Sequence, residues 1–180
     1  MAKLVGAFAA SHAPLLIRGW EQVAPDRRQR LDAAFRELGR RFSALHPDVV
    51  IVVSPDHWVN FFINNLPSVC LGIGEAHDGP PEPFMKDFPH KPLIGHPALA
   101  RHILETALAA DFDPAVSHRL TIDHGFCIPL WRMELERLPP LIPMIVNDLE
   151  PPMPSLRRCF GWGRMLAAAI ASYPADLRVV

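Results

Sequence analysis

Several features that often reveal a protein's class are scarce in this sequence of 180 residues. Only three cysteines are present, Cys70, Cys127 and Cys159, and they form no CxxC pair, which argues against a disulfide framework and against a zinc ribbon. Eighteen basic residues are balanced by 19 acidic ones, so the net charge of -1 lacks the basic excess typical of nucleic-acid-binding domains. These absences favour a small-molecule protein with no nucleic-acid partner.

Long apolar runs and targeting signals are also missing. No apolar stretch approaches the roughly 18 residues of a membrane span. The first 20 residues are interrupted by Ser11, His12 and Pro14, which a secretory signal peptide would not contain. We therefore expect a cytoplasmic protein that does not associate with a membrane.

Proline and histidine, by contrast, are abundant. The chain has 20 prolines, and nine histidines against one tyrosine. Prolines and glycines are concentrated in residues 74–97, a segment too long for a simple connection. We predict that this segment is an ordered functional loop.

Hydrophobic patterning predicts alternating strands and helices. Strands are expected over 4–9, 49–53, 61–63, 69–73, 115–122, 141–146 and 177–180. Helices are expected over 25–45, 97–110, 128–138 and 154–172, the last burying Leu156, Phe160, Leu166 and Ile170. The alternation predicts an α/β fold with a largely parallel sheet, in one domain over residues 1–180.

Three histidines share one position relative to the predicted strands. His12, His57 and His124 each follow a strand-like segment closely. If the strands are parallel, all three loops open at one edge of the sheet, where α/β proteins bind their ligands. Imidazole is the commonest protein ligand for borderline metals, and two histidines with one carboxylate suit either non-haem Fe(II) or a hydrolytic zinc.

Residue pattern alone leaves the third ligand and the chemistry open. The available carboxylates are Asp56, Glu75, Asp123 and Glu150. Asp56 and Asp123 adjoin candidate histidines, where a carboxylate more often orients an imidazole or caps a turn. Cys127 close to His124 allows a nucleophile pair, although a buried hydrophobic role is favoured. The remaining histidines are expected to have no direct role: His46, His77, His90, His96, His102 and His118.

Five stretches stand out in chain order: Ser11-His12-Ala13-Pro14, Ser54-Pro55-Asp56-His57 with Phe61-Phe62, Cys70-Leu71-Gly72-Ile73-Gly74, Asp123-His124-Gly125-Phe126 and residues 154–174. Taken together, these motifs resemble the class III extradiol ring-cleavage dioxygenases. Within that family, the sequence is similar to the protocatechuate 4,5-dioxygenase catalytic subunits and the 2,3-dihydroxyphenylpropionate 1,2-dioxygenases. The resemblance spans essentially the whole chain.

The resemblance implies a fold, a cofactor and a set of roles. It implies a mixed sheet flanked by helices, Fe(II) bound by His12 and His57, and His124 as an acid in ring cleavage. The substrates would be O2 and a catechol, most simply one bearing a carboxylate, and the protein would be a homo-oligomer. Residues 74–97 would border the active site.

The resemblance also implies that residues 1–180 form about two thirds of such an enzyme. In the family, a second active-site histidine and the glutamate ligand of the iron come after the strand that begins near Val179. The alternative interpretation is a non-catalytic relative that binds a metal or another ligand. The presence of His12, His57 and His124 together favours the enzyme.

Overall fold

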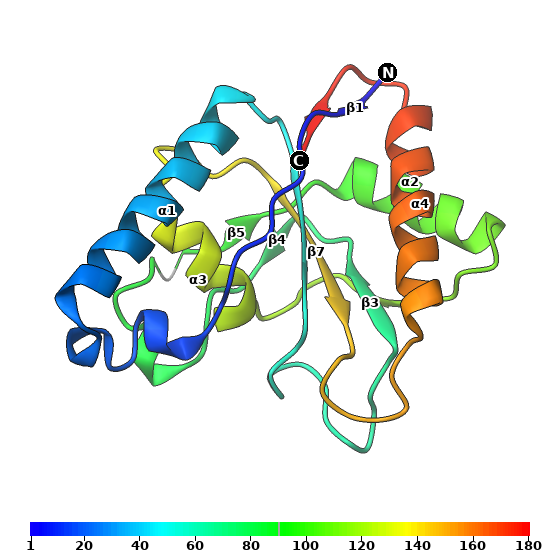
Figure 1. The fold of residues 1–180 in the computed structure, drawn as a ribbon. Helices are drawn as coiled ribbons and strands as arrows, with labels where there is room; N and C mark the ends of the chain where they lie inside the picture. The colour runs from blue at the N-terminus through cyan, green and yellow to red at the C-terminus, as the bar shows by residue number, and fades with distance from the viewer. Residues whose placement is uncertain (90) are drawn as a thin grey trace.

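Strands and helices alternate along the chain, as the sequence pattern predicts (Figure 1). The computed structural model describes residues 1–89 and 91–180. The helices are α1 (Pro25–Ala44), α2 (Pro97–Ala109), α3 (His124–Arg132) and α4 (Leu156–Ser172), with 3-10 turns η1 (Pro14–Leu16), η2 (Trp20–Gln22) and η3 (Pro83–Met85). The strands are β1 (Lys3–Leu4), β2 (Val50–Ser54), β3 (Val69–Gly72), β4 (Ala76–His77), β5 (Leu93–Ile94), β6 (Ala115–Ser117), β7 (Leu141–Val146) and β8 (Arg178–Val179).

The central sheet has the strand order β2-β7-β3-β6. The pairs β2–β7 and β3–β6 are parallel, whereas β3 and β7 are antiparallel. A further parallel pair, β1–β8, lies beside β2, because the Ile51 N–H donates to the Val180 carbonyl and the Val180 N–H donates to the Val49 carbonyl. The sheet is therefore mixed and mostly parallel, which confirms the predicted fold class.

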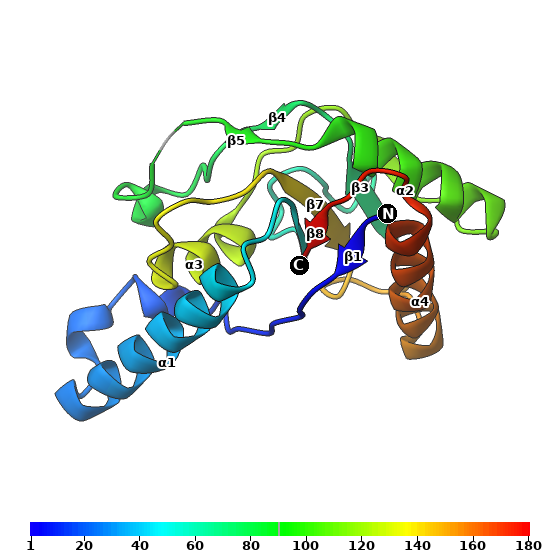
Figure 2. The ribbon, with the colours of Figure 1, turned by 90° about the horizontal axis from the view of Figure 1, so that it is seen from above.

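Two hydrophobic layers enclose this sheet (Figure 2). Strand β7 is a continuous apolar run with five consecutive buried residues, as expected for a strand covered on both faces. On one side, α2 and α4 pack against the sheet through residues such as Ile103 and Trp162. On the other side, α1 and α3 pack through residues such as Phe42 and Phe126. Among the described residues, no helix has both the length and the hydropathy needed to cross a membrane.

The predicted inward face of α4 is confirmed in the second half of the helix and wrong in its first turns. Ile170 is buried and Leu166 packs against the core, as expected. Leu156 and Phe160, by contrast, are 89% and 72% exposed. The helix also buries Trp162, Met165 and Ala169, so its contact with the core that contains α2 and the sheet begins at Trp162.

The expectation that the strands before His57 and His124 end at the same edge of the sheet is wrong for β6. Because β6 is parallel to β3 and β3 is antiparallel to β7, the carboxyl end of β6 lies at the edge opposite to that of β2. The strand ends at Ser117, and the following residues return toward the loop after β2. There the Thr121 N–H donates to the Asn60 side chain (2.9 Å), which in turn donates to the Thr121 carbonyl (2.8 Å). His124 thus reaches the same region as His57 by a returning segment and not by a parallel strand.

Other predicted elements are shorter or absent. The strand expected over 4–9 is reduced to β1, and the one expected over 61–63 is replaced by an isolated bridge between Phe62 and Asn65. The helix expected over 128–138 begins earlier, at His124, and ends at Arg132. Residues 74–97 contain β4, η3 and β5, with the two strands paired antiparallel.

Gly39 sets the distance between α1 and α3, which gives a test of this packing. A Cβ at Gly39 would lie 2.0 Å from the backbone oxygen of Met133, so backbone would have to move. We expect Gly39→Ala to destabilise the fold by about 1–3 kcal/mol in urea unfolding. Gly163→Ala in α4 is the matched control, because its Cβ would meet nothing within 4 Å and should raise stability by about 0.5–1 kcal/mol. Equal effects of the two substitutions would contradict the close approach of α1 and α3.

Candidate functional site

The turn that carries His57 is built by the side chain of Asp56. This carboxylate is buried and accepts hydrogen bonds from the backbone N–H groups of Val59, Asn60 and Phe61 at 3.0–3.1 Å. Trp58, directly after His57, has a φ of 59°, a left-handed conformation that is unusual for a bulky residue. Asp56 therefore caps the turn, one of the two roles expected for it, and does not contact an imidazole.

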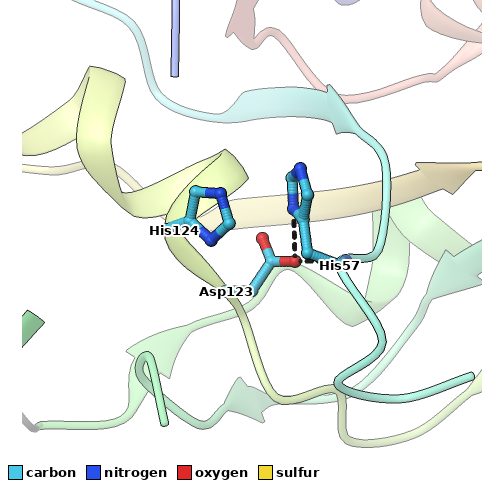
Figure 3. Close-up of side chains that lie close together, drawn as sticks. All are labelled: His57, Asp123 and His124. Atoms are coloured by element: carbon cyan, nitrogen blue, oxygen red, sulfur yellow. Dashed lines mark hydrogen bonds and ion pairs between the residues drawn. The ribbon is translucent and has the colours of Figure 1, made fainter. Parts of the chain in front are cut away.

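His57 is held by Asp123, a residue 66 positions further along the chain (Figure 3). The His57 backbone N–H donates to Asp123 Oδ2 at 2.7 Å, and His57 Nδ1 lies 2.9 Å from the same oxygen. The other carboxylate oxygen accepts from the Gly125 N–H at 2.8 Å, which caps α3. The ring of His57 is thereby fixed through Nδ1, which leaves Nε2 for other partners.

The His57–Asp123 contact shifts both pKa values. The hydrogen bond to Asp123 raises the pKa of His57 above its ordinary value, against the effect of burial. Burial by itself would raise the pKa of Asp123, whose side chain is 1% exposed, but the hydrogen bonds from His57 hold it below the usual range. Between these two pKa values the buried pair is ionised, which strengthens the contact.

His124 is the first residue of α3 and has a carboxylate partner of its own. Its Nδ1 lies 2.8 Å from Glu82 Oε1, and its backbone N–H donates to the same oxygen at 3.1 Å. The Phe84 ring packs edge-on against the imidazole, with ring centroids 5.6 Å apart. The side chain of His124 is 9% exposed, so it is enclosed on most sides.

His12 completes a group of three imidazoles. Its ring centroid lies 5.1 Å from that of His57 and 6.0 Å from that of His124, while those two are 4.0 Å apart. Burial, followed by the proximity of His57 and His124, lowers the pKa of His12, so this ring favours the neutral form that binds metals. The structure thus brings together all three histidines that the sequence analysis selected.

The end of α3 opposite His124 supports the loop of His12. Arg132, the last residue of α3, donates to the Leu16 carbonyl and to Asp32 (3.1 Å). Its guanidinium lies over the Trp20 ring, 3.9 Å from the centroid. One short helix therefore orders both His124 at its start and the segment after His12 at its end.

These side chains form a candidate metal site. The potential ligand atoms of His57, Asp123 and His124 all lie within 4.8 Å of one another. Both oxygens of Asp123 already accept hydrogen bonds, whereas Nε2 of His57 has no hydrogen-bond partner among residues 1–89 and 91–180. The donor chemistry therefore fits a metal held by imidazole nitrogens, with Asp123 orienting one of them.

A mostly apolar cavity of about 460 Å³ adjoins this group. It borders His12 and Gly125 and is otherwise lined largely by apolar residues, among them Phe8, Val52 and Leu166. This volume is in the range of small-molecule sites. None of the described residues in 74–97 lines this cavity, and the segment instead contacts His124 through Glu82 and Phe84.

The remaining sequence candidates lie outside this group or have structural contacts. The Cys127 thiol is buried, lies 3.6 Å from the Ile122 carbonyl, and has a pKa raised by burial, which fits the structural role favoured for it. Glu75 is exposed, so it offers no buried ligand. His77 is buried and accepts from the Leu120 N–H, and His96 caps α2. His90 lies outside the described residues.

Glu82 was missed by the sequence analysis. It lies in the Pro-rich segment, 42 positions before His124, and no periodic pattern links the two. The only available signal was an acidic residue between two prolines, Pro81 and Pro83, in a segment already expected to be functional.

The comparisons with known proteins agree with the resemblance inferred from the motifs. Residues 6–180 match the family model described as "Catalytic LigB subunit of aromatic ring-opening dioxygenase". A 2,3-dihydroxyphenylpropionate/2,3-dihydroxicinnamic acid 1,2-dioxygenase from Cupriavidus necator is 36% identical over 172 residues, which cover 91% of this chain and 49% of the relative. Proteins with this activity in their names from Dechloromonas aromatica (29%) and Escherichia coli K12 (28%) match 93% of this chain and 50% of their own lengths.

The chain spans about half the length of these relatives, a smaller share than the two thirds expected. The match runs through all three histidines, because it begins before His12 and ends after His124. The chain belongs to the family of the catalytic LigB subunit of aromatic ring-opening dioxygenases.

Proposed function

We propose that the protein of this chain performs Fe(II)-dependent extradiol cleavage of a catechol with O2. The observation that carries the proposal is the convergence of His12, His57 and His124, with ring centroids 4.0–6.0 Å apart, beside an apolar cavity. The relatives are named for activity on 2,3-dihydroxyphenylpropionate, a catechol with a carboxylate side chain. A carboxylate-bearing catechol is accordingly the proposed substrate class.

His12 and His57 are the proposed iron ligands. Burial lowers the pKa of His12, which favours its neutral form, and Asp123 holds the His57 ring through Nδ1. Both side chains therefore offer an imidazole nitrogen suited to a divalent metal. Two histidines leave several coordination positions open, as non-haem iron sites require. When bound, Fe(II) supplies Lewis-acid activation of the catechol hydroxyls and redox chemistry with O2.

His124 is the proposed acid. Glu82 engages its Nδ1, so Nε2 is the nitrogen that remains to hold or deliver a proton at the reacting ring. The ring of His124 is mostly enclosed and is tilted against the His57 ring, with centroids 4.0 Å apart, so it lies beside the proposed ligand. This enclosure also restricts the access of water to the proton.

We also propose that the protein is cytoplasmic and forms a homo-oligomer. The three cysteines are free thiols, which suits the cytoplasm. The outer surface of α4 exposes Leu156 and Phe160, and such apolar residues favour assembly into a homo-oligomer.

The function is tested by loading the protein with Fe(II) under anaerobic conditions and measuring O2 uptake with a series of catechols. Ring cleavage gives a coloured or ultraviolet-absorbing product together with O2 consumption. Cleavage of a carboxylate-bearing catechol would support the proposal. Iron binding without O2 uptake for any catechol would instead support a non-catalytic relative.

Iron retention distinguishes the ligands from their neighbours. We expect His12→Ala and His57→Ala to lose Fe(II) on gel filtration, because each removes one of the imidazole donors. His124→Ala should keep it, and Asp123→Asn should bind iron about 10–100-fold more weakly, because the orientation of His57 is loosened. Iron content measured by atomic emission tests this assignment. Full iron occupancy in His12→Ala would show that the metal uses the His57–Asp123–His124 group instead.

Turnover tests the role of His124. In an iron-loaded protein that cleaves a catechol, we expect His124→Ala to lower kcat by about two to four orders of magnitude, the usual contribution of acid–base catalysis. The control is His118→Ala, outside the group of three histidines. Unchanged kcat in His124→Ala would exclude the proposed acid.

The pKa of His57 in the metal-free protein tests the contact with Asp123. In the native chain this pKa lies above its ordinary value, because the carboxylate stabilises the imidazolium. In Asp123→Asn the charge is lost while burial remains, so the pKa of His57 should fall. Histidine resonances followed by NMR against pH provide the measurement, with Asp78→Asn, whose carboxylate pairs with Arg119, as a control. A His57 pKa that is the same in the native chain and Asp123→Asn would contradict the contact.

A further inference from the structure

Glu82 stands out because its carboxylate contacts the active-site group from the Pro-rich loop, far from His124 in the sequence. One oxygen, Oε1, accepts from the Nδ1 and from the backbone N–H of His124, at 2.8 and 3.1 Å. The side chain of Glu82 is 15% exposed, so these contacts are formed away from bulk water. Within the described residues, the ion pair of Glu82 is with His124, and no lysine or arginine pairs with it.

The loop around Glu82 is anchored on both sides. Strands β4 and β5 pair antiparallel at its base, and the Gly95 N–H donates to the Glu75 carbonyl at 2.7 Å. Beyond Glu82, Met85 and Phe88 are 1% and 7% exposed and belong to the hydrophobic layer that contains α3. These anchors hold Glu82 against the start of α3.

The local sequence restricts Glu82 further. Pro81 and Pro83 flank it, and each fixes its own φ, while Pro83 also confines Glu82 to an extended conformation. Phe84 then packs edge-on against the His124 ring. The carboxylate and the aromatic ring therefore reach the same imidazole from two sides.

The second oxygen of Glu82, Oε2, is buried and accepts no hydrogen bond from any described residue. The hydrogen bonds that described residues give to this carboxylate therefore all come from His124. Asp123 provides the contrast, because both of its oxygens are engaged.

We propose that Glu82 is a positioning residue for His124. By accepting from Nδ1–H it fixes the ring orientation and the tautomer, so that the lone pair or proton of Nε2 faces the reacting group. Through Glu82, the loop contributes one positioning side chain to the active-site group, although none of its described residues lines the cavity beside His12. The role of Glu82 in catalysis rests on the proposed function, whereas its effect on the imidazole does not.

The effect on the imidazole is tested by NMR on the metal-free 180-residue chain labelled with 15N-histidine. At about pH 8, where an ordinary imidazole is neutral, long-range 1H–15N spectra report which ring nitrogen carries the proton. We expect His124 to be the Nδ1–H tautomer in the native chain and in Glu82→Gln, whose amide oxygen still accepts. Glu82→Ala should convert it to a mixture or to the Nε2–H form. An unchanged His124 tautomer in Glu82→Ala would overturn the proposal.

Kinetics in the iron-loaded protein test the consequence. Glu82→Ala should lower kcat by about 10–100-fold with the KM for the catechol and the iron content unchanged, whereas Glu82→Gln should restore most of kcat. Asp87→Asn, an exposed carboxylate on the same loop, is the control and should match the native protein. Equal changes in kcat and KM in both Glu82 variants, with a lowered melting temperature, would indicate a structural role and overturn the proposal.

The two readouts separate this inference from the proposed function. If the native protein cleaves no catechol, the proposed function fails, while the His124 tautomer still decides whether Glu82 positions the ring. If the native protein is active and the tautomer does not respond to Glu82→Ala, the positioning role fails and the proposed function stands.

Discussion

The active-site group depends on the hydrogen bonds that the buried carboxylate of Asp123 accepts. This carboxylate accepts from the backbone and the ring of His57 and from the first turn of α3, so it joins the loop after β2 to the start of that helix. The carboxylate is almost completely removed from water, and the hydrogen bonds compensate for its desolvation. These hydrogen bonds fix the position of His57, on the loop after β2, relative to His124, at the start of α3. Gly125 contributes by its lack of a side chain, because a Cβ there would approach Ser54, Asp123 and the His57 ring at 2.4–3.0 Å.

The group is organised as two histidine–carboxylate pairs with one further histidine. Asp123 engages Nδ1 of His57 and Glu82 engages Nδ1 of His124, so both rings are held by the same nitrogen and keep Nε2 for chemistry. The two carboxylates differ in how fully they are used. Both oxygens of Asp123 accept hydrogen bonds, which suits a fixed support for a metal ligand, whereas Oε2 of Glu82 is buried and has no partner among the described residues. This asymmetry parallels the different roles proposed for the ligand His57 and the acid His124.

Much of the fold was predictable because its signals are local. The continuous apolar run of β7 and the spacing of Phe35 and Phe42 in α1 specify a buried strand and an amphipathic helix, whatever surrounds them. The predictions were wrong where contacts with other elements determine the structure. The exposure of Leu156 and Phe160 depends on where α4 begins its contact with the core. The direction of β6 depends on its pairing with β3, which periodicity does not record.

The sequence by itself determined the α/β class and the choice of His12, His57 and His124, because residue type and position after a strand are local properties. It also favoured capping or orienting roles for Asp56 and Asp123, while leaving the third metal ligand open. Only the tertiary structure decided that Asp123 supports His57 and not its neighbour His124. The same is true of Glu82, 42 positions earlier in the chain, which supports His124. The physical reason is that a hydrogen bond requires two groups within about 3 Å, and separation along the chain does not predict which groups folding brings that close.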